Sequence, residues 1–179
     1  IVINLAGRNI FSYWTKKYKQ MIYDSRVLTT QQVVEAIKPG AVLLSASAVG
    51  YYGDMGEQEL TEDFPAGDDF LASVCVDWEA QARAAEAKDV RVNILRFGVV
   101  LGKGGALDKM VPAFKFMAGG PLGSGKQWFP WIHIKDLFEA MAFIVAAPSL
   151  SGVFNMVAPD QVRQKEFARH LGRALGRPA

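Results

Sequence analysis

Polar and glycine residues gather directly after the apolar runs of this chain, where buried strands would end. Ala6–Gly7 follow the first run, Ser45–Ser47 the second, Gly98–Gly102 a third and His133–Asp136 a shorter fourth. Hydroxyl groups can donate hydrogen bonds to a ligand, and glycines let a ligand approach the backbone closely. The carboxyl ends of parallel strands share one edge of a sheet, so these residues predict a ligand site at that edge.

Residues that bind metals and phosphates in many proteins are sparse here or stand in the wrong context. Cys75 is the only cysteine, and both histidines lie far from it, so we expect no disulfide within these residues and no metal site. Gly119–Gly125 is rich in glycine but leads into Trp128 and Trp131 instead of a helix. No Gly-Lys pair precedes Ser or Thr, as the Walker motif requires. We therefore expect no phosphate-binding loop within this sequence.

Composition restricts the class of protein further. The chain has 179 residues, of which 50% are hydrophobic and 21% charged, so it can bury a core and global disorder is not expected. Lys and Arg number 20 against 18 Asp and Glu, a formal charge of +2, and the basic residues are scattered. We expect no nucleic-acid partner and no membrane partner, since no apolar run approaches the ~20 residues that span a bilayer. The expected location is the cytoplasm.

Short apolar runs alternate with segments of helical periodicity. The expected strands are Ile1–Leu5, Ala41–Leu44, Val90–Leu95, Trp131–Ile134 and Val153–Val157. The clearest helix places one apolar face at i, i+3, i+4, i+7 spacing, with Leu71, Val74, Cys75, Trp78, Ala82 and Ala85. Further helices are expected over Ser25–Lys38, over Leu107–Met117 with a kink at Pro112, after Asp136, and over Gln164–Leu175. This alternation predicts an α/β fold with a parallel sheet.

Four segments in this order resemble a known family. They are Asn4-Leu5-Ala6-Gly7, Ser45–Gly53, Leu95–Gly102 and Trp131–Leu137. The chain resembles extended short-chain dehydrogenase/reductases, and more narrowly the NAD-dependent epimerase/dehydratase-like "epimerase family protein" subgroup, to which Gly119–His133 is especially similar. Some relatives were labelled cell-division inhibitors.

The resemblance implies a Rossmann-like, doubly wound parallel sheet that begins, in this chain, at the family's fourth strand. It implies that the first strands, their glycine-rich loop and a C-terminal domain lie outside residues 1–179, which would form a partial NAD(P)-binding domain. Residues of about 103–135 would form elements of a substrate cleft. By this comparison the full protein is longer than the sequence at hand.

The same resemblance assigns residues to an NAD or NADP cofactor. Leu5, Ala6 and Gly7 match the strand end that passes the adenosine half, and Arg8, which follows directly, could reach a phosphate or be a solvated surface residue. Ser45 and Ala46 match the next strand end, and Gly98 and Val99 match the segment whose backbone contacts the nicotinamide. The residue that distinguishes NAD from NADP falls outside the sequence, so both remain open.

For catalysis, Ser47 matches the family's serine, whose hydroxyl would orient a substrate oxygen. The chain departs from the family at its Tyr and Lys, four residues apart on one helix, because Leu71 and Cys75 occupy these positions. An unassisted tyrosine has a pKa of about 10, some three units too high for efficient base catalysis at neutral pH. Tyr51, or else Tyr52 or water, would handle the proton, although these aromatic rings also suit simple packing.

Two functions of different class therefore remain open. The first is an NAD(P)-binding oxidoreductase or epimerase that transfers a hydride at a carbinol or carbonyl carbon of an unidentified small molecule. The second is a cofactor-binding scaffold or regulator without turnover, linked to cell division as in some relatives' labels. A module that binds no nucleotide would follow only if the full protein lacked the glycine-rich loop. Family members pair through two helices, which implies a homodimer through Ser25–Lys38 and Asp69–Lys88.

Overall fold

The computed structural model describes residues 1–178 and divides into two compact units. The first unit comprises residues 1–96 and 141–155, and the second comprises residues 97–140 together with those from 156 onward. The hydrogen-bonded side chains around Ser47, those of Glu79 and Arg96, belong to the first unit.

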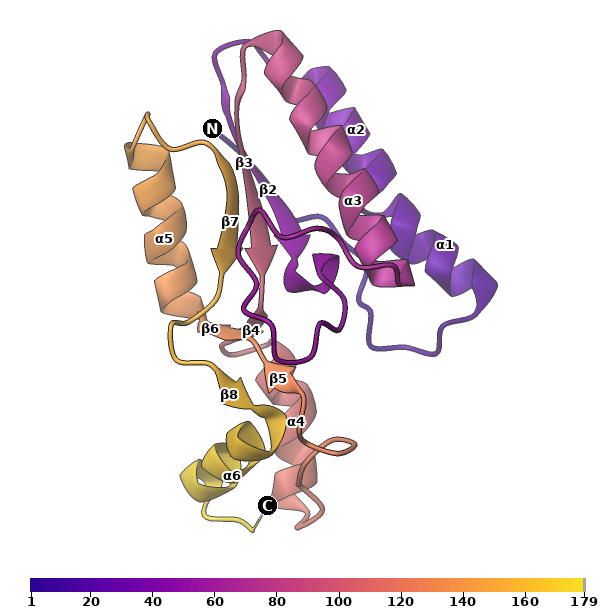
Figure 1. The fold of residues 1–179 in the computed structure, drawn as a ribbon, viewed down its shortest axis with the longest axis vertical. Helices are drawn as coiled ribbons and strands as arrows, with labels where there is room; N and C mark the ends of the chain where they lie inside the picture. Colours follow the sequence, from indigo (N-terminus) through magenta and orange to yellow (C-terminus); the bar gives the residue numbers. More distant parts are fainter. Residues whose placement is uncertain (179) are drawn as a thin grey trace. The chain divides into compact units, whose positions relative to one another are not determined.

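A four-stranded sheet forms the centre of the first unit (Figure 1). Its strands are β1 (Val2–Asn4), β2 (Val42–Ala48), β3 (Arg91–Phe97) and β7 (Gly152–Met156), in the order β1-β2-β3-β7. β1 and β2 are parallel, with Val2 opposite Leu43 and Asn4 opposite Ser45. Strands that are parallel neighbours need a crossover connection, and helices supply it here. The predicted α/β fold with a parallel sheet is confirmed.

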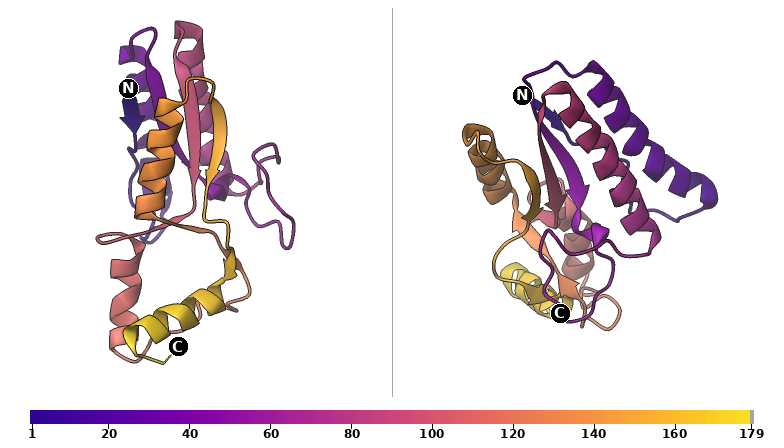
Figure 2. Two further views of the ribbon diagram at one scale, coloured as in Figure 1. Left: turned by 90° about the vertical axis from the view of Figure 1, so that its left-hand side faces the viewer. Right: turned by 45° about the horizontal axis from the view of Figure 1, so that its top comes forward.

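Helices cover both faces of this sheet (Figures 1 and 2). On one face lie α1 (Lys16–Asp24), α2 (Val27–Ala36) and α3 (Phe70–Arg83), and α3 continues into the 3₁₀ helix η2 (Ala84–Lys88). On the other face lie residues 141–146 of α5 (Ile134–Ala146), whose earlier residues belong to the second unit. A short 3₁₀ helix, η1 (Val49–Tyr51), follows β2 directly.

The apolar core of the first unit lies between the sheet and helices α2 and α3. Its buried members come from both helices and from β2 and β3: Val34, Ile37, Leu43, Ala82, Ala85, Val90, Val92 and Ile94. Strand side chains alternate between faces, so Ser47 on β2 and Arg96 on β3 continue the same face as Leu43 and Ile94. This face is therefore apolar near the amino ends of the strands and polar near their carboxyl ends.

The predicted helix over Leu71–Ala85 corresponds to α3 and the start of η2. Asp69 caps it by accepting a hydrogen bond from the Ala72 amide, which satisfies one free donor of the first turn. The loop before it closes on η1, because the Gly67 amide donates to the Tyr51 carbonyl at 2.9 Å. A Cβ at Gly67 would lie 2.6 Å from the Tyr52 carbonyl oxygen, so only glycine fits this close approach.

The second unit holds two small two-stranded sheets. β4 (Val99–Leu101) pairs in parallel with β6 (Trp131–His133), and β5 (Trp128–Phe129) pairs antiparallel with β8 (Val162–Arg163). Its other helices are α4 (Ala106–Lys115), which contains Pro112, and α6 (Gln164–Leu175). Asp136 lies in the first turn of α5, as predicted. The segment of about 103–135, expected to form cleft elements, falls within this unit.

Candidate functional site

Ser47, the expected catalytic serine, is buried at the end of β2. Its side chain contacts α3, where its hydroxyl donates a hydrogen bond to Glu79 Oε1 at 2.7 Å, and the residue is only 2% exposed. A serine hydroxyl has one proton to donate. To donate to a substrate oxygen, Ser47 would therefore have to release Glu79.

Glu79 and Arg96 form a buried ion pair beside Ser47. Arg96 Nε donates to Glu79 Oε1 and Arg96 Nη2 to Glu79 Oε2, both at 2.8 Å, while the residues are 2% and 5% exposed. Burial alone would lower the pKa of Arg96, but hydrogen bonds to Glu79 and Tyr52 and the charge of Glu79 hold it above its ordinary value. This two-bond geometry is the strongest that a guanidinium and a carboxylate can form. Arg96 is therefore charged at any physiological pH.

Tyr51 and Tyr52 both contact Arg96, but in different ways. The Tyr52 hydroxyl accepts a hydrogen bond from Arg96 Nη1 at 2.8 Å and donates one to Asn155 Oδ1 at 2.7 Å. The Tyr51 ring lies over the guanidinium, with 3.4 Å between its centroid and Arg96 Cζ. No residue among 1–178 hydrogen-bonds the Tyr51 hydroxyl, and this side chain is half-buried. Of the two phenols, Tyr51 is thus the one with an unused hydroxyl.

The loop between η1 and α3 is fastened to the same polar group. Arg96 Nη1 also donates to the Glu62 carbonyl at 3.0 Å, and the Asn155 amide donates to the Glu62 carboxylate at 2.8 Å. Asn155 Nδ2 adds a bond to the Leu60 carbonyl. Residues from β2, β3, β7, α3 and this loop therefore meet in one connected network.

Leu71 and Cys75, which the resemblance matches to the family's Tyr and Lys, supply no usable acid or base. A Cβ built at Gly50 would lie 3.8 Å from Leu71 Cβ, which places the Leu71 side chain against the turn after β2. Cys75 is buried, and burial raises the pKa of its thiol to about 11. Cys75 thus lies on the buried apolar face of α3, where the helical spacing placed it.

The segment after β1, expected to pass the adenosine half of a cofactor, is open and well anchored. Leu5 is 56% exposed, and Gly7 and Arg8 are also exposed. The Arg8 amide donates to Ser25 Oγ at 2.9 Å, and Arg26 Nη2 donates to the Arg8 carbonyl at 3.1 Å. A Cβ at Gly7 would lie 3.2 Å from the Arg26 guanidinium. This exposed segment is therefore anchored through Ser25 and Arg26, and its part in a cofactor site stays a prediction.

The remaining cofactor candidates are less accessible. Ser45 and Ala46 are buried within β2, and no residue among 1–178 hydrogen-bonds Ser45 Oγ. Gly98 and Val99 belong to the second unit, where their amides already donate to the carbonyls of Met156 and Pro130. A Cβ at Gly98 would lie 2.8 Å from the Pro130 oxygen, so this glycine is required by packing. The contribution of these four residues to a cofactor site stays a prediction.

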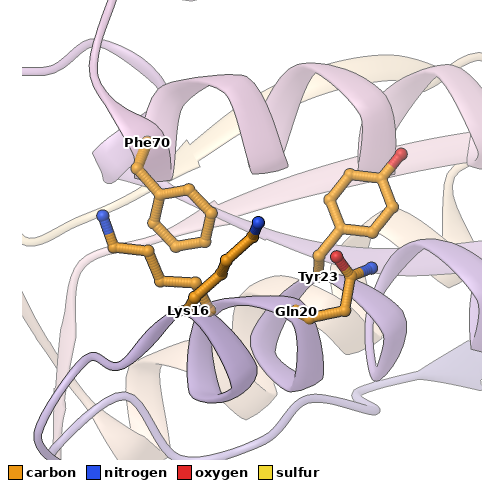
Figure 3. A pocket seen from close by; sticks show the side chains of 5 residues that line it. Lys16, Gln20, Tyr23 and Phe70 are labelled. Carbon is orange, nitrogen blue, oxygen red and sulfur yellow. The ribbon is translucent and has the colours of Figure 1, made fainter.

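A shallow pocket that sequence reasoning missed lies between α1 and the start of α3 (Figure 3). It has a volume of about 240 Å³ and is lined by Lys16, Lys19, Gln20, Tyr23 and Phe70. Lys19 Nζ lies 4.9 Å from the centre of the Phe70 ring. None of the expected site residues lines this pocket, so it is separate from the network around Ser47.

Residues 1–178 contain neither a metal-binding cluster nor a helix able to span a membrane. No group of three or more His, Cys, Asp or Glu side chains is placed to hold a metal ion. No helix in that range has the length and apolar character needed to cross a bilayer.

The sheet order and the helices on both faces of the sheet are those of an α/β protein of the Rossmann type. The chain belongs to the NAD dependent epimerase/dehydratase family, whose model matches residues 1–156. The resemblance noted in the sequence is thereby confirmed.

Named relatives agree with this assignment. The Arabidopsis thaliana "Epimerase family protein SDR39U1 homolog, chloroplastic" is 47% identical over 185 residues, which cover 99% of this chain and 53% of that protein. The crystal structure of human epimerase family protein SDR39U1 (isoform 2) with NADPH is 40% identical, with a TM-score of 0.92, over 99% of this chain and 63% of that one. The chain thus spans between half and two thirds of these relatives.

A more distant structure shows the fold alone. The UDP-glucuronic acid 4-epimerase from Bacillus cereus, in complex with UDP-glucuronic acid and NAD, is 19% identical with a TM-score of 0.82. The match covers 99% of this chain and 60% of that one.

Cys75 should be unreactive in the native protein. Its folded pKa of about 11 lies above the ordinary 9.0, so it remains a thiol at pH 8. We expect an aromatic disulfide reagent at pH 8 to label Cys75 only after unfolding in urea, with Cys75→Ser as the control that subtracts any other thiol. The native state holds the Cys75 proton up to a higher pH than the unfolded state does. The free energy of unfolding should therefore fall as pH rises from 9 to 11. Rapid labelling of native Cys75 would contradict this assignment.

Glu79→Gln should destabilise the protein strongly. Removing one charge of a buried pair leaves Arg96 charged without compensation, which costs about 3–5 kcal/mol of unfolding free energy. Glu139→Gln is the matched control, because Glu139 pairs with Lys135 at 3.7 Å on the surface and should change stability by less than about 1 kcal/mol. Urea denaturation of both variants measures the difference. Equal effects would show that the buried pair is not a central contact.

Proposed function

We propose that the chain is part of an NAD(P)-dependent oxidoreductase or epimerase-like protein. When bound, the nicotinamide would accept or supply a hydride at a carbinol or carbonyl carbon of a small-molecule substrate. The observation that carries this proposal is the open, anchored segment Leu5–Arg8 at a strand end, in a chain that belongs to an NAD dependent family.

NADP and NAD are both candidates for the cofactor. A relative with 40% identity has been crystallised with NADPH, which supports NADPH as the first choice. Leu5–Arg8 would hold the ribose through backbone contacts, because Gly7 has no side chain to block them. Ser45, Ala46, Gly98 and Val99 would contribute backbone only, since the first two are buried and the last two are held by their neighbours.

The proposed chemistry uses the two polar candidates predicted from the sequence. Tyr51 would exchange the proton with the substrate oxygen, because its hydroxyl is unused whereas that of Tyr52 makes two hydrogen bonds. Ser47 would orient the substrate oxygen only by releasing Glu79. The structure thus supports Tyr51 more strongly than Ser47.

A specific observation favours the second candidate function, a cofactor-binding scaffold without turnover. Leu71 and Cys75 replace the acid–base pair, and Ser47 has committed its proton to a buried carboxylate. If the scaffold is correct, the protein binds cofactor, yet a panel of carbonyl and sugar-nucleotide substrates gives no turnover above background.

The cofactor proposal is tested by thermal unfolding of the full-length protein. A ligand that binds only the native state raises stability by about 2.7 kcal/mol at 100 times its Kd, so NADPH or NADH should raise Tm. Gly7→Val should abolish the rise, because its side chain pushes into the ribose path and onto Arg26. Gly120→Val, at a site with open space, should retain it. No shift with either cofactor at millimolar concentration would defeat the proposal.

We further propose a homodimer formed through α2 and α3. The outer side of α3 presents small or apolar exposed residues at helical spacing, namely Ser73, Val76 and Ala80, which suits close packing of helices. A cytoplasmic location likewise stays a prediction.

Light scattering at tens of micromolar full-length protein should give the mass of a dimer. Val76→Arg should produce monomers, because it places a charge in the middle of the helix contact, whereas Ser149→Arg in an exposed loop should remain dimeric. A monomeric parent protein would remove the proposal.

A further inference from the structure

We infer that Arg96, held in place by Glu79, is a positioning residue that fixes the Tyr51 side chain for the proposed reaction. The inference rests on the proposed function and names two residues, Arg96 and Glu79, that sequence reasoning had not placed in the site.

Four of the five N–H donors of the Arg96 guanidinium are hydrogen-bonded. Two of its bonds reach the Glu79 carboxylate at 2.8 Å, one reaches the Tyr52 hydroxyl at 2.8 Å and one the Glu62 carbonyl at 3.0 Å. These partners come from α3, η1's end and the following loop, so moving the guanidinium requires breaking contacts to several elements. The faces of the planar guanidinium remain available for stacking.

Tyr51 packs on that face. Its ring centroid lies 3.4 Å from Arg96 Cζ, which is direct stacking contact and well inside the ~6 Å range of a cation–π interaction. The ring also meets Tyr52 edge to face, with 5.3 Å between centroids. Two fixed groups therefore restrict the ring of Tyr51, while its hydroxyl makes no hydrogen bond to any residue among 1–178.

Ser47 also helps to hold the Glu79–Arg96 pair. Its hydroxyl donates to Glu79 Oε1, the oxygen that also accepts from Arg96 Nε. The carboxylate thus receives three hydrogen bonds, which keep its plane aligned with the guanidinium. Ser47 is by this inference a positioning residue that acts through Glu79.

The contribution of Arg96 is one of position more than of charge. Glu79 Oε1 lies 2.8 Å from Arg96 Nε, so the carboxylate balances the guanidinium charge. The electric field at Tyr51 is therefore that of two opposite charges close together. Arg96 therefore does not replace the missing family lysine as a free cation. Misplacing a reacting group by about 1 Å can cost on the order of 10²-fold in rate, which is the scale of effect expected here.

The kinetic test uses full-length protein, NADPH and a panel of carbonyl substrates. Tyr51→Phe should reduce kcat by roughly 10²-fold or more, since the hydroxyl is lost while the stacked ring remains. Arg96→Lys should also reduce kcat, by at least ~10-fold, with the Kd for NADPH unchanged. The double variant should be no slower than Tyr51→Phe, because Arg96 acts only through Tyr51. Tyr13→Phe, at a residue 86% exposed, is the control.

A spectroscopic test reads the contact without turnover and covers the case in which Arg96→Lys does not fold. The Arg96 Nε proton should be shifted by the ring current of Tyr51 in an NMR spectrum. Tyr51→Leu should remove this shift, whereas Tyr51→Phe should keep it and Tyr13→Phe should leave it unchanged.

The outcomes separate the inference from the proposed function. If the effects of Arg96→Lys and Tyr51→Phe on turnover are non-additive and the ring-current shift is present, the inference and the proposed function are both supported. Turnover that does not change in Arg96→Lys, or a spectrum without the Tyr51 shift, overturns the inference alone. A parent protein that binds NADPH and shows the shift but turns over no substrate overturns the proposed hydride transfer and, with it, the role of Arg96 in a reaction.

Discussion

The ion pair between Glu79 and Arg96 is the contact on which the polar end of the first unit depends. Both side chains are removed from water, a cost of several kcal/mol for each ion, and only their paired geometry and added hydrogen bonds offset it. Ser47, Tyr52 and the Glu62 carbonyl supply those bonds. Strand ends, helix α3 and the loop before it are thus held together by a single ion pair.

This constraint also governs what the site can do. A serine whose proton belongs to a carboxylate cannot at the same time polarise a carbonyl group, and a thiol with a pKa of about 11 cannot replace a lysine. What remains is Tyr51, with an unused hydroxyl above a fixed guanidinium. Under the proposed function, the choice between a slow or specialised enzyme and a scaffold would therefore depend on the Tyr51 phenol, whereas cofactor binding would depend on Leu5–Arg8.

Much of the fold was predictable because local patterns carry it. Apolar runs in the sequence predicted β2 and β3, and apolar residues at helical spacing predicted α3. α1 was missed, since of its residues only Ile22 is buried and it starts at Lys16 with a polar run. Glu79 and Arg96 were missed as partners because they lie 17 residues apart on different elements, and pairing between elements is not periodic. The signal available in the sequence was a charged residue on each of two otherwise apolar faces. Glu79 lies on the apolar side of α3, and Arg96 lies on β3, two residues after Ile94.

The most direct measurement of this account is hydrogen exchange at the Arg96 Nε–H group, followed by ¹⁵N NMR on the full-length protein. If the Glu79 pair organises the site, this proton exchanges only when the surrounding structure opens, as slowly as the backbone amide of Ile94 in β3. The exposed side chain of Arg83 provides the fast reference within the same spectrum. Exchange at Arg96 as fast as at Arg83 would show that the guanidinium is not held, and would contradict the central claim.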